Sequence, residues 1–260
     1  MPTLMMDGRS VRYSDLGSGD AVILLHSGAS SSGQWSDLCD RLEGRYRVLA
    51  PDFIGCGGSA PWTSPEAFHI EHEVALVRAV TTHCDGPFHL IGHSYGGRVA
   101  LQMVKDGTLP VRSLALYEPN PFWLLAEAGE TALMAEIREV AQTFGARLEA
   151  DEPETAMSRF IDYWGGPGTW DQTPEKTRAY LLDRAGTVNA VFPVCLEGDI
   201  ALADLKAFRV PTLLLKGGNT HQVTGRLADI LARHLRAVNV MAIPGVGHMA
   251  PLTHPGRVNP

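Results

Sequence analysis

The chain has 260 residues, which is long enough for one large domain or for a domain with an insertion. Hydrophobic residues make up 45% of the sequence and charged residues 20%, which excludes an intrinsically disordered chain, since disorder combines low hydrophobicity with high charge. The formal net charge is −7 and lysine and arginine form no cluster, so we expect no nucleic-acid partner.

Short apolar runs alternate with amphipathic stretches over the first 120 residues. The runs are bounded by glycine and proline, as is typical of strands buried on both faces. The predicted strands are Ala21–Leu25, Val48–Ala50, Phe88–Ile91 and Leu114–Tyr117. The predicted helices between them are Gln34–Leu42, Glu66–Thr82 and Gly96–Lys105. This alternation predicts a parallel sheet in an α/β domain.

The alternation is interrupted from about Pro121 to Arg209. Three helices are predicted there, at Thr131–Phe144, Pro153–Tyr163 and Pro174–Ala185. It then resumes with a buried strand at Thr212–Leu215, a helix at Gly225–Leu235 and a buried strand at Val240–Ile243. We therefore predict the first part of an α/β core over residues 1–120, a helical cap, or lid, over 121–209, and the second part of the core over 210–260.

Aromatic residues are dense in the predicted cap, which holds three of the five tryptophans. They are Phe122, Trp123, Phe160, Tyr163, Trp164 and Trp170. Two interpretations stay open: these rings form the core of the cap, or some of them line an apolar pocket. We include Trp123, Tyr163 and Trp164 in a predicted substrate pocket, together with His26.

The segment Gly92–Gly97 (GHSYGG) follows a predicted strand and leads into a predicted helix. This is Gly-x-Ser-x-Gly in the strand–turn–helix context of a nucleophile elbow. A sharp turn holds the serine hydroxyl clear of the backbone at a helix N-terminus, where amides favour developing negative charge. The alternative is a glycine-rich turn that happens to contain a serine, since 27 residues are glycine. We favour Ser94 as a nucleophile.

Two further segments supply the remaining parts of such a site. The loop His26–Ala29 follows the first predicted strand and can offer a backbone N–H to an oxyanion, beside the N–H of Tyr95. His248 follows the last predicted strand, at the sheet edge where ligands bind in open α/β folds. We predict that His248 is the general base.

Taken in order, these landmarks resemble those of lid-bearing bacterial α/β-hydrolases over essentially the whole chain. The further landmarks are Trp35, the turn Asp52–Ser59 (DFIGCGGS) and Pro211–Leu215 (PTLLL). The resemblance implies the α/β-hydrolase fold, a mostly parallel central sheet flanked by helices with a helical cap between two late strands. It also implies cofactor-free, metal-free cleavage of an ester, thioester or related acyl bond in a small, largely apolar substrate.

The sequence departs from the family pattern in the oxyanion loop and at the acid of the triad. Ser27 stands where glycine is usual, so the amide of Gly28 is aligned with the oxyanion. The loop after Pro211–Leu215 contains no carboxylate, and Thr220 stands near the expected place of the acid. Glu118 ends a neighbouring strand, and adjacent strands lie ~5 Å apart, so we predict Glu118 as the acid and Asp199 as the reserve.

Other candidates point to structural roles. We expect Asp52 to brace a turn. His69, Glu71, His72 and Glu73 could suggest metal ligands, but no further ligand accompanies them and a solvated helix face is favoured. The N-terminus has no basic region followed by an apolar run, and the four cysteines form no Cys-x-x-Cys pair. We expect a cytoplasmic protein without a membrane partner.

Three functions compete with ester hydrolysis. Hydrolysis of a C–C bond, as in a β-diketone, would use the same residue types, and cofactor-free haloperoxidase or lyase chemistry is known on the same fold. Dehalogenases and epoxide hydrolases of this fold use aspartate at the elbow, whereas this chain has serine. A small-molecule receptor that retains the triad is the alternative from another class. The sequence does not indicate an oligomeric state.

Overall fold

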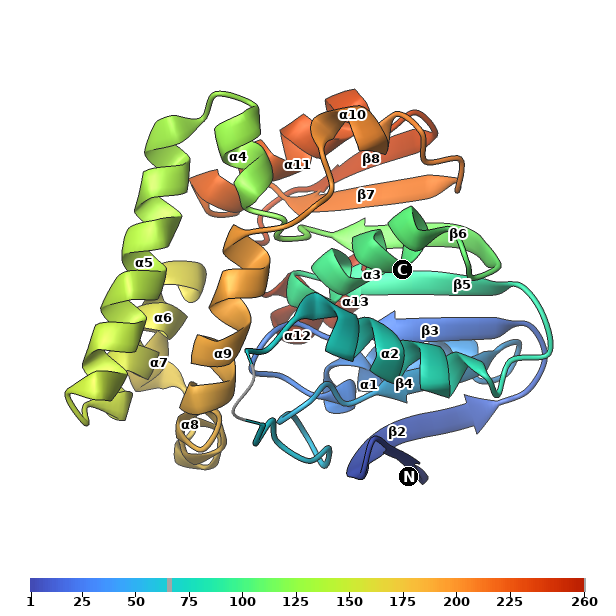
Figure 1. Ribbon diagram of the computed structural model, residues 1–260, viewed down its shortest axis with the longest axis horizontal. Coiled ribbons are helices and arrows are strands. Elements are labelled where there is room, and N and C mark those ends of the chain that lie inside the picture. The colour runs from blue at the N-terminus through green and yellow to red at the C-terminus, as the bar shows by residue number, and fades with distance from the viewer. Residues whose placement is uncertain (65–66, 260) are drawn as a thin grey trace.

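The computed structural model describes residues 1–64 and 67–259 and is built on one eight-stranded sheet (Figure 1). The strands lie in the order β1-β2-β4-β3-β5-β6-β7-β8. Strands β3 to β8 are parallel to one another, while β2 is antiparallel to both β1 and β4. The strands are β1 Thr3–Met6, β2 Arg9–Gly17, β3 Ala21–Leu25, β4 Arg47–Pro51, β5 Phe88–His93, β6 Val111–Tyr117, β7 Thr212–Gly217 and β8 Val238–Ile243.

All six predicted strands are present, and two more precede them. Strand β1 has only four residues, none of them buried, and β2 contains no continuous apolar run, because only one of its faces is covered. In β2, Val11 and Tyr13 are buried while Arg12 between them is exposed. The prediction of a fully buried strand at β8 was wrong. That strand lies at the edge of the sheet, and Val240 and Met241 are 48% and 53% exposed.

The helices of the core cover both faces of the sheet. They are η1 Ser32–Trp35, α1 Ser36–Leu42, α2 Ile70–Thr81, α3 Tyr95–Asp106, α10 Leu202–Leu205, α11 Gln222–His234, α12 Ala250–Thr253 and α13 Pro255–Val258. The helix predicted from Glu66 begins at Ile70, and residue 66 lies outside the described residues. Among the described residues, no helix is both long and apolar enough to cross a membrane.

The predicted helical insertion is confirmed between β6 and β7. The short helix α4 Trp123–Glu127 leads into it, and the cap consists of α5 Thr131–Glu149, α6 Pro153–Gly165, α7 Thr169–Gln172, α8 Glu175–Leu182 and α9 Ala185–Leu196. The sequence predicted a helix through Ala185 and missed α9 as a separate element. In Figure 1 the cap stands beside one end of the sheet, and Phe144, Met157, Val188 and Phe192 form a separate buried cluster inside it.

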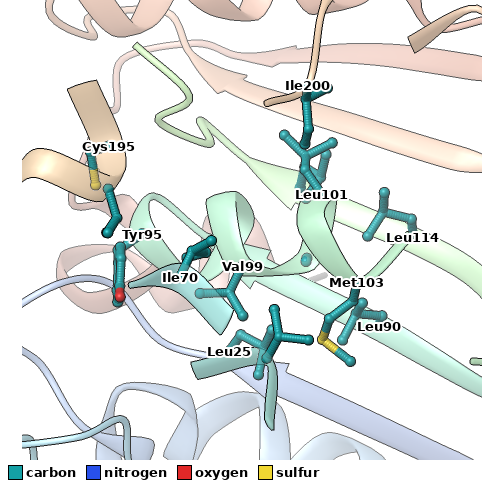
Figure 2. Close-up of a cluster of buried hydrophobic side chains, with 14 of the residues drawn as sticks. Leu25, Ile70, Leu90, Tyr95, Val99, Leu101, Met103, Leu114, Cys195 and Ile200 are labelled. Atoms are coloured by element: carbon teal, nitrogen blue, oxygen red, sulfur yellow. The ribbon is translucent and has the colours of Figure 1, made fainter. Parts of the chain in front are cut away.

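Helix α3 anchors the segment that carries Ser94. Its side chains Val99, Leu101 and Met103 are fully buried, and Figure 2 shows them packed among side chains of the sheet such as Leu25 and Leu90. Because interior packing is as dense as in an organic crystal, the start of α3 is held rigidly against the ends of β3 and β5.

Candidate active site

Ser94 occupies the turn between β5 and α3 in a strained conformation. Its φ of 54° and ψ of −114° lie in a region that non-glycine residues rarely adopt. The glycines around it are required by close backbone approaches. A Cβ on Gly92 would lie 2.6 Å from the Gly96 carbonyl oxygen, and one on Gly96 would lie 2.2 Å from the Leu25 carbonyl oxygen. The turn leaves the Ser94 hydroxyl within reach of His248.

Ser94, His248 and Glu118 form a continuous chain of hydrogen bonds. Nε2 of His248 lies 3.0 Å from Oγ of Ser94, and Nδ1 lies 2.7 Å from Oε2 of Glu118. The three residues come from the ends of β5, β8 and β6, and all are buried. In this geometry the hydroxyl can pass its proton to Nε2 while the carboxylate accepts a hydrogen bond from Nδ1–H.

Glu118 is held as a carboxylate by its partners. The Gly217 amide donates to Oε1 at 2.7 Å, and the Thr220 hydroxyl donates to Oε2 at 2.6 Å. Burial on its own would raise the pKa of Glu118, but the hydrogen bonds from His248, Thr220 and Gly217 lower that pKa below its usual value. Thr220 stands where the family usually has the acid. Here its hydroxyl donates a hydrogen bond to Glu118, the acid that follows the neighbouring strand β6.

Asp199 lies away from this chain of hydrogen bonds. Its side chain is 65% exposed and pairs with Nζ of Lys105 at 2.5 Å, on the connection between α9 and α10. Nε2 of Gln102 also donates to its Oδ1 at 3.3 Å. The reserve role that the sequence left to Asp199 therefore has no support from its position.

The two residues whose amides are predicted to hold an oxyanion, Gly28 and Tyr95, line the same cavity as Ser94. Tyr95 is the first residue of α3, and a Cβ built on Gly28 would lie 3.8 Å from Cβ of Tyr95, so the two segments are in contact. Gln34, which the sequence analysis did not single out, fixes the loop: its Oε1 accepts from the Ser27 amide at 3.1 Å and from the Ser27 hydroxyl at 2.8 Å. Serine in place of the usual glycine thus gains a partner.

Two histidines brace these loops from behind. His26 is fully buried and is not among the described residues that line the cavity, which corrects its prediction as a pocket residue. The Phe53 amide donates to its Nε2 at 3.0 Å, so Nδ1–H donates to the Ser27 carbonyl at 2.6 Å, and burial lowers the His26 pKa to about 4. His93, missed in the sequence, donates from Nε2 to the His248 carbonyl at 2.9 Å.

A cavity of about 980 Å³ opens above Ser94 between the cap and the core. Of the three aromatic residues predicted to line a pocket, Tyr163 and Trp164 line this cavity, and the Trp164 ring lies 4.8 Å from the His248 ring. Trp123 is not among the described residues that line it. Its indole N–H instead donates to the Ile200 carbonyl at 2.8 Å and its ring contacts the Arg98 guanidinium, which corrects its prediction as a pocket residue.

The cavity wall is uncharged apart from histidine. None of the described residues that line it is aspartate, glutamate, lysine or arginine. Its apolar wall comes mainly from the cap, from Phe160, Ile161, Trp164, Leu181, Val188, Val191 and Phe192. Such a wall favours an apolar, neutral ligand, because burying an unpaired charge is costly.

Polar contacts join the cap to the core on two sides of the cavity. On one side the Tyr180 hydroxyl donates to the Ser30 carbonyl at 2.7 Å. On the other, Nε2 of His221 at the start of α11 lies 3.7 Å from Oε1 of Glu136 in the cap. The Tyr163 ring lies 4.2 Å from the His221 ring, and the Tyr163 hydroxyl donates to the same Glu136 oxygen within the cap at 2.8 Å. These contacts hold the cap over the cavity.

Of the residues predicted to form a solvated helix face, His69 and Glu71 are exposed and His72 is half-buried, whereas Glu73 differs from the prediction. Glu73 is fully buried, because it lies on the face of the helix that also buries Ile70, Val74 and Val77. Among the described residues, no group of three or more His, Cys, Asp or Glu side chains is arranged to hold a metal ion.

Asp52 braces its turn, as the sequence predicts. Its carboxylate accepts hydrogen bonds from the Ser32 amide at 2.7 Å and from the Gly58 amide at 2.8 Å.

Residues 22–260 match the sequence model of one family, which is described as "Alpha/beta hydrolase family". The chain belongs to the α/β hydrolase family. It is 22% identical to a pimeloyl-[acyl-carrier protein] methyl ester esterase of Nitrosomonas europaea, over 95% of both chains. A 2-hydroxy-6-oxo-6-(2'-aminophenyl)hexa-2,4-dienoic acid hydrolase of Metapseudomonas resinovorans is 33% identical over 36% of this chain and 33% of that protein.

The fold is also seen in solved structures. A hydrolase from Pseudomonas aeruginosa PA01 superposes with a TM-score of 0.81 at 19% identity, covering 99% of this chain and 95% of the other. The distant relatives include esterases, lipases, dehalogenases and C–C hydrolases. The protein is therefore a hydrolase of this family with esterase-like relatives, and its substrate has to be inferred from its own cavity.

Proposed function

We propose that this α/β-hydrolase cleaves an ester, thioester or related acyl bond of a small, neutral, largely apolar substrate through an acyl-enzyme. The observation that carries the proposal is the hydrogen-bonded chain of Ser94, His248 and Glu118 at the floor of an uncharged cavity. A methyl ester esterase among the relatives is consistent with this chemistry.

In the proposed mechanism, Oγ of Ser94 attacks the substrate carbonyl carbon while Nε2 of His248 takes its proton. The amides of Gly28 and Tyr95 stabilise the oxyanion of the tetrahedral intermediate, and Glu118 stabilises the imidazolium. His248 then protonates the leaving oxygen or sulfur as the acyl–serine ester forms. Water activated by the same imidazole hydrolyses that ester and restores Ser94.

The uncharged wall distinguishes this proposal from C–C bond hydrolysis. The relative that carries the name of a dienoic acid hydrolase acts on a carboxylic acid, which is an anion at neutral pH. A site built for such a substrate would be expected to provide a cation, and no lysine or arginine is among the described residues lining this cavity. The ester therefore remains the better candidate.

A panel of p-nitrophenyl esters with acyl chains of increasing length tests the proposal, with Ser94→Ala as the blank. A matched pair sharpens it: two esters of equal chain length, one ending in a methyl group and one in a carboxylate. We expect multiple turnovers and a kcat/KM at least about tenfold higher for the neutral ester, since an unpaired buried charge costs more than 1.4 kcal/mol. Single-turnover labelling alone would favour a receptor, and preference for the carboxylate would contradict the neutral-substrate proposal.

A further inference from the structure

Glu73 is a buried carboxyl group behind the proposed oxyanion hole, to which the mechanism above gives no role. It lies on α2 with none of its surface exposed. No ion pair joins it to a lysine, arginine or histidine among the described residues. An isolated buried carboxylate is costly, so an acid in this position is expected to be kept for its effect on its neighbours.

The Glu73 carboxyl contacts two groups. Its Oε2 accepts a hydrogen bond from the Ile54 amide at 3.3 Å. The Tyr95 side chain acts on the Glu73 pKa as a hydrogen-bond partner and lowers it. Oε1 of Glu73 and the Tyr95 hydroxyl are both buried, and neither has a partner at hydrogen-bond distance among the described residues, which leaves the two atoms available to each other.

These two contacts lead to the two arms of the proposed oxyanion hole. One arm is Tyr95 itself, whose backbone amide is a proposed donor. The other arm is reached through Ile54, since the amide of its neighbour Phe53 donates to His26, which in turn donates to the Ser27 carbonyl next to Gly28. The rings of Phe53 and Tyr95 also meet edge-on, with centroids 5.3 Å apart. A single carboxyl group therefore spans both donors.

We propose that Glu73 is a positioning residue that holds both arms of the oxyanion hole as an uncharged acid, and that its ionisation suppresses hydrolysis at alkaline pH. A neutral carboxyl can accept from the Ile54 amide with one oxygen and donate to the Tyr95 hydroxyl with the other. Ionisation reverses that hydrogen bond, since only the Tyr95 hydroxyl can then donate, and it places a negative charge behind the site where the oxyanion develops. The inference rests on the proposed acyl transfer.

The surroundings of Glu73 support an uncharged state. Burial raises its pKa to about 8, against smaller opposing effects of the Ile54 amide and the Tyr95 side chain. The titratable groups that face it are Tyr95 from α3 and Cys56 from the β4–α2 loop, and burial raises the pKa of both. Arg98 and Cys195 act on the Tyr95 hydroxyl, and Figure 2 shows Cys195 beside Tyr95. The Arg98 guanidinium forms no ion pair with Glu73 and donates to the Gln102 side chain and to the Val194 carbonyl.

The test is the dependence of kcat on pH for Glu73→Gln. This variant keeps the shape of the side chain and can make both proposed hydrogen bonds, to the Ile54 amide and to the Tyr95 hydroxyl, but it cannot ionise. We expect wild-type kcat on a p-nitrophenyl ester to fall at least about tenfold between pH 7.5 and pH 9.5, with KM little changed, as the neutral fraction declines. Glu73→Gln should lose most of this fall. Glu71→Gln, on the exposed side of the same helix, is the matched control and should keep the wild-type profile.

Two further measurements keep the proposal falsifiable if Glu73→Gln folds poorly. Tyr95→Phe removes a partner that lowers the Glu73 pKa, so the midpoint of the alkaline fall should move to higher pH. In unfolding experiments, the free energy of unfolding of Glu73→Gln should rise relative to that of wild type from about pH 5 to pH 8. Over this range the folded wild type keeps the Glu73 proton, whereas the unfolded wild type has lost it.

Two results would overturn the proposal: superimposable pH profiles of kcat for wild type and Glu73→Gln, or a wild-type profile without an alkaline fall. Loss of all Ser94-dependent turnover at neutral pH would instead refute the proposed function.

Discussion

The floor of the cavity and its roof are built in opposite ways. The floor consists of polar groups from the ends of β5, β6 and β8, each fixed by at least one partner, such as Thr220 and Gly217 on Glu118. The roof is largely apolar and comes from the cap, where rings such as Trp164 and Phe160 contact one another edge-on.

This contrast separates chemistry from specificity. Reaction geometry requires particular residue types at fixed separations, which only rigid strand ends can provide. Apolar recognition requires a volume and a shape, and many combinations of side chains satisfy it. The following changes test the two regions separately: damage to the floor should reduce turnover of every substrate, while damage to the roof should alter preference among substrates.

The largest effect is expected from Glu118→Gln. This change keeps the shape of the side chain and removes the charge that stabilises the imidazolium, so we expect turnover to fall on the order of 10⁴-fold, or ~5 kcal/mol of transition-state stabilisation. Steady-state kinetics, with folding checked by thermal melting, measure it. Asp199→Asn is the control and should stay near wild type, because Asp199 pairs with Lys105 outside the cavity. The opposite ranking would transfer the role to Asp199.

A smaller and selective effect is expected from Trp164→Ala. The indole lies against His248 and narrows the cavity, so its removal should favour long acyl chains over short ones by about tenfold in relative kcat/KM, the usual scale for an apolar pocket contact. The ester panel measures the ratio. Trp123→Ala is the matched control outside the cavity and should lower the melting temperature without changing the ratio. An unchanged ratio in Trp164→Ala would mean that this ring belongs to the core of the cap.

The smallest effect is expected from Thr220→Val, which removes one hydrogen bond to the Glu118 carboxylate. We expect a loss of about fivefold in kcat, within the value of a hydrogen bond to a charged group. Because the bond lowers the Glu118 pKa, its contribution to stability is present at neutral pH and is lost as the pH falls through that pKa. The variant should therefore unfold at a higher pH than wild type during acid titration. An unchanged acid midpoint would contradict this account of Glu118.

Much of the fold could be predicted from the sequence because buried parallel strands leave continuous apolar runs. Strands covered on one face leave weaker signals, so β1 and β2 were missed and the exposure of β8 was misjudged. The Gly-x-Ser-x-Gly turn could be recognised because its backbone has room only for glycine at Gly92 and Gly96. Glu118 could be proposed because the loop around Thr220 has no carboxylate.

The rest of the site depends on the directions in which side chains point, and residue type alone does not determine these directions. His26 and Trp123 have the chemistry of pocket residues, yet the first faces the Phe53 amide and the second faces Arg98. Glu73 was assigned to a solvated face because no further metal ligand accompanies it and the neighbouring histidines in the sequence. The spacing of Ile70, Val74 and Val77 places it on the apolar face, and this periodicity was the signal that could have identified it.

The central claim is that Ser94 is the nucleophile of an acyl-transferring enzyme. Intact-protein mass spectrometry after treatment with a fluorophosphonate tests it most directly, followed by peptide mapping of the adduct. The account predicts one adduct per chain, mapped to Ser94 and absent from Ser94→Ala, together with loss of ester turnover in proportion to labelling. An adduct that forms at full strength in Ser94→Ala, or ester turnover that persists in the fully labelled protein, would contradict it.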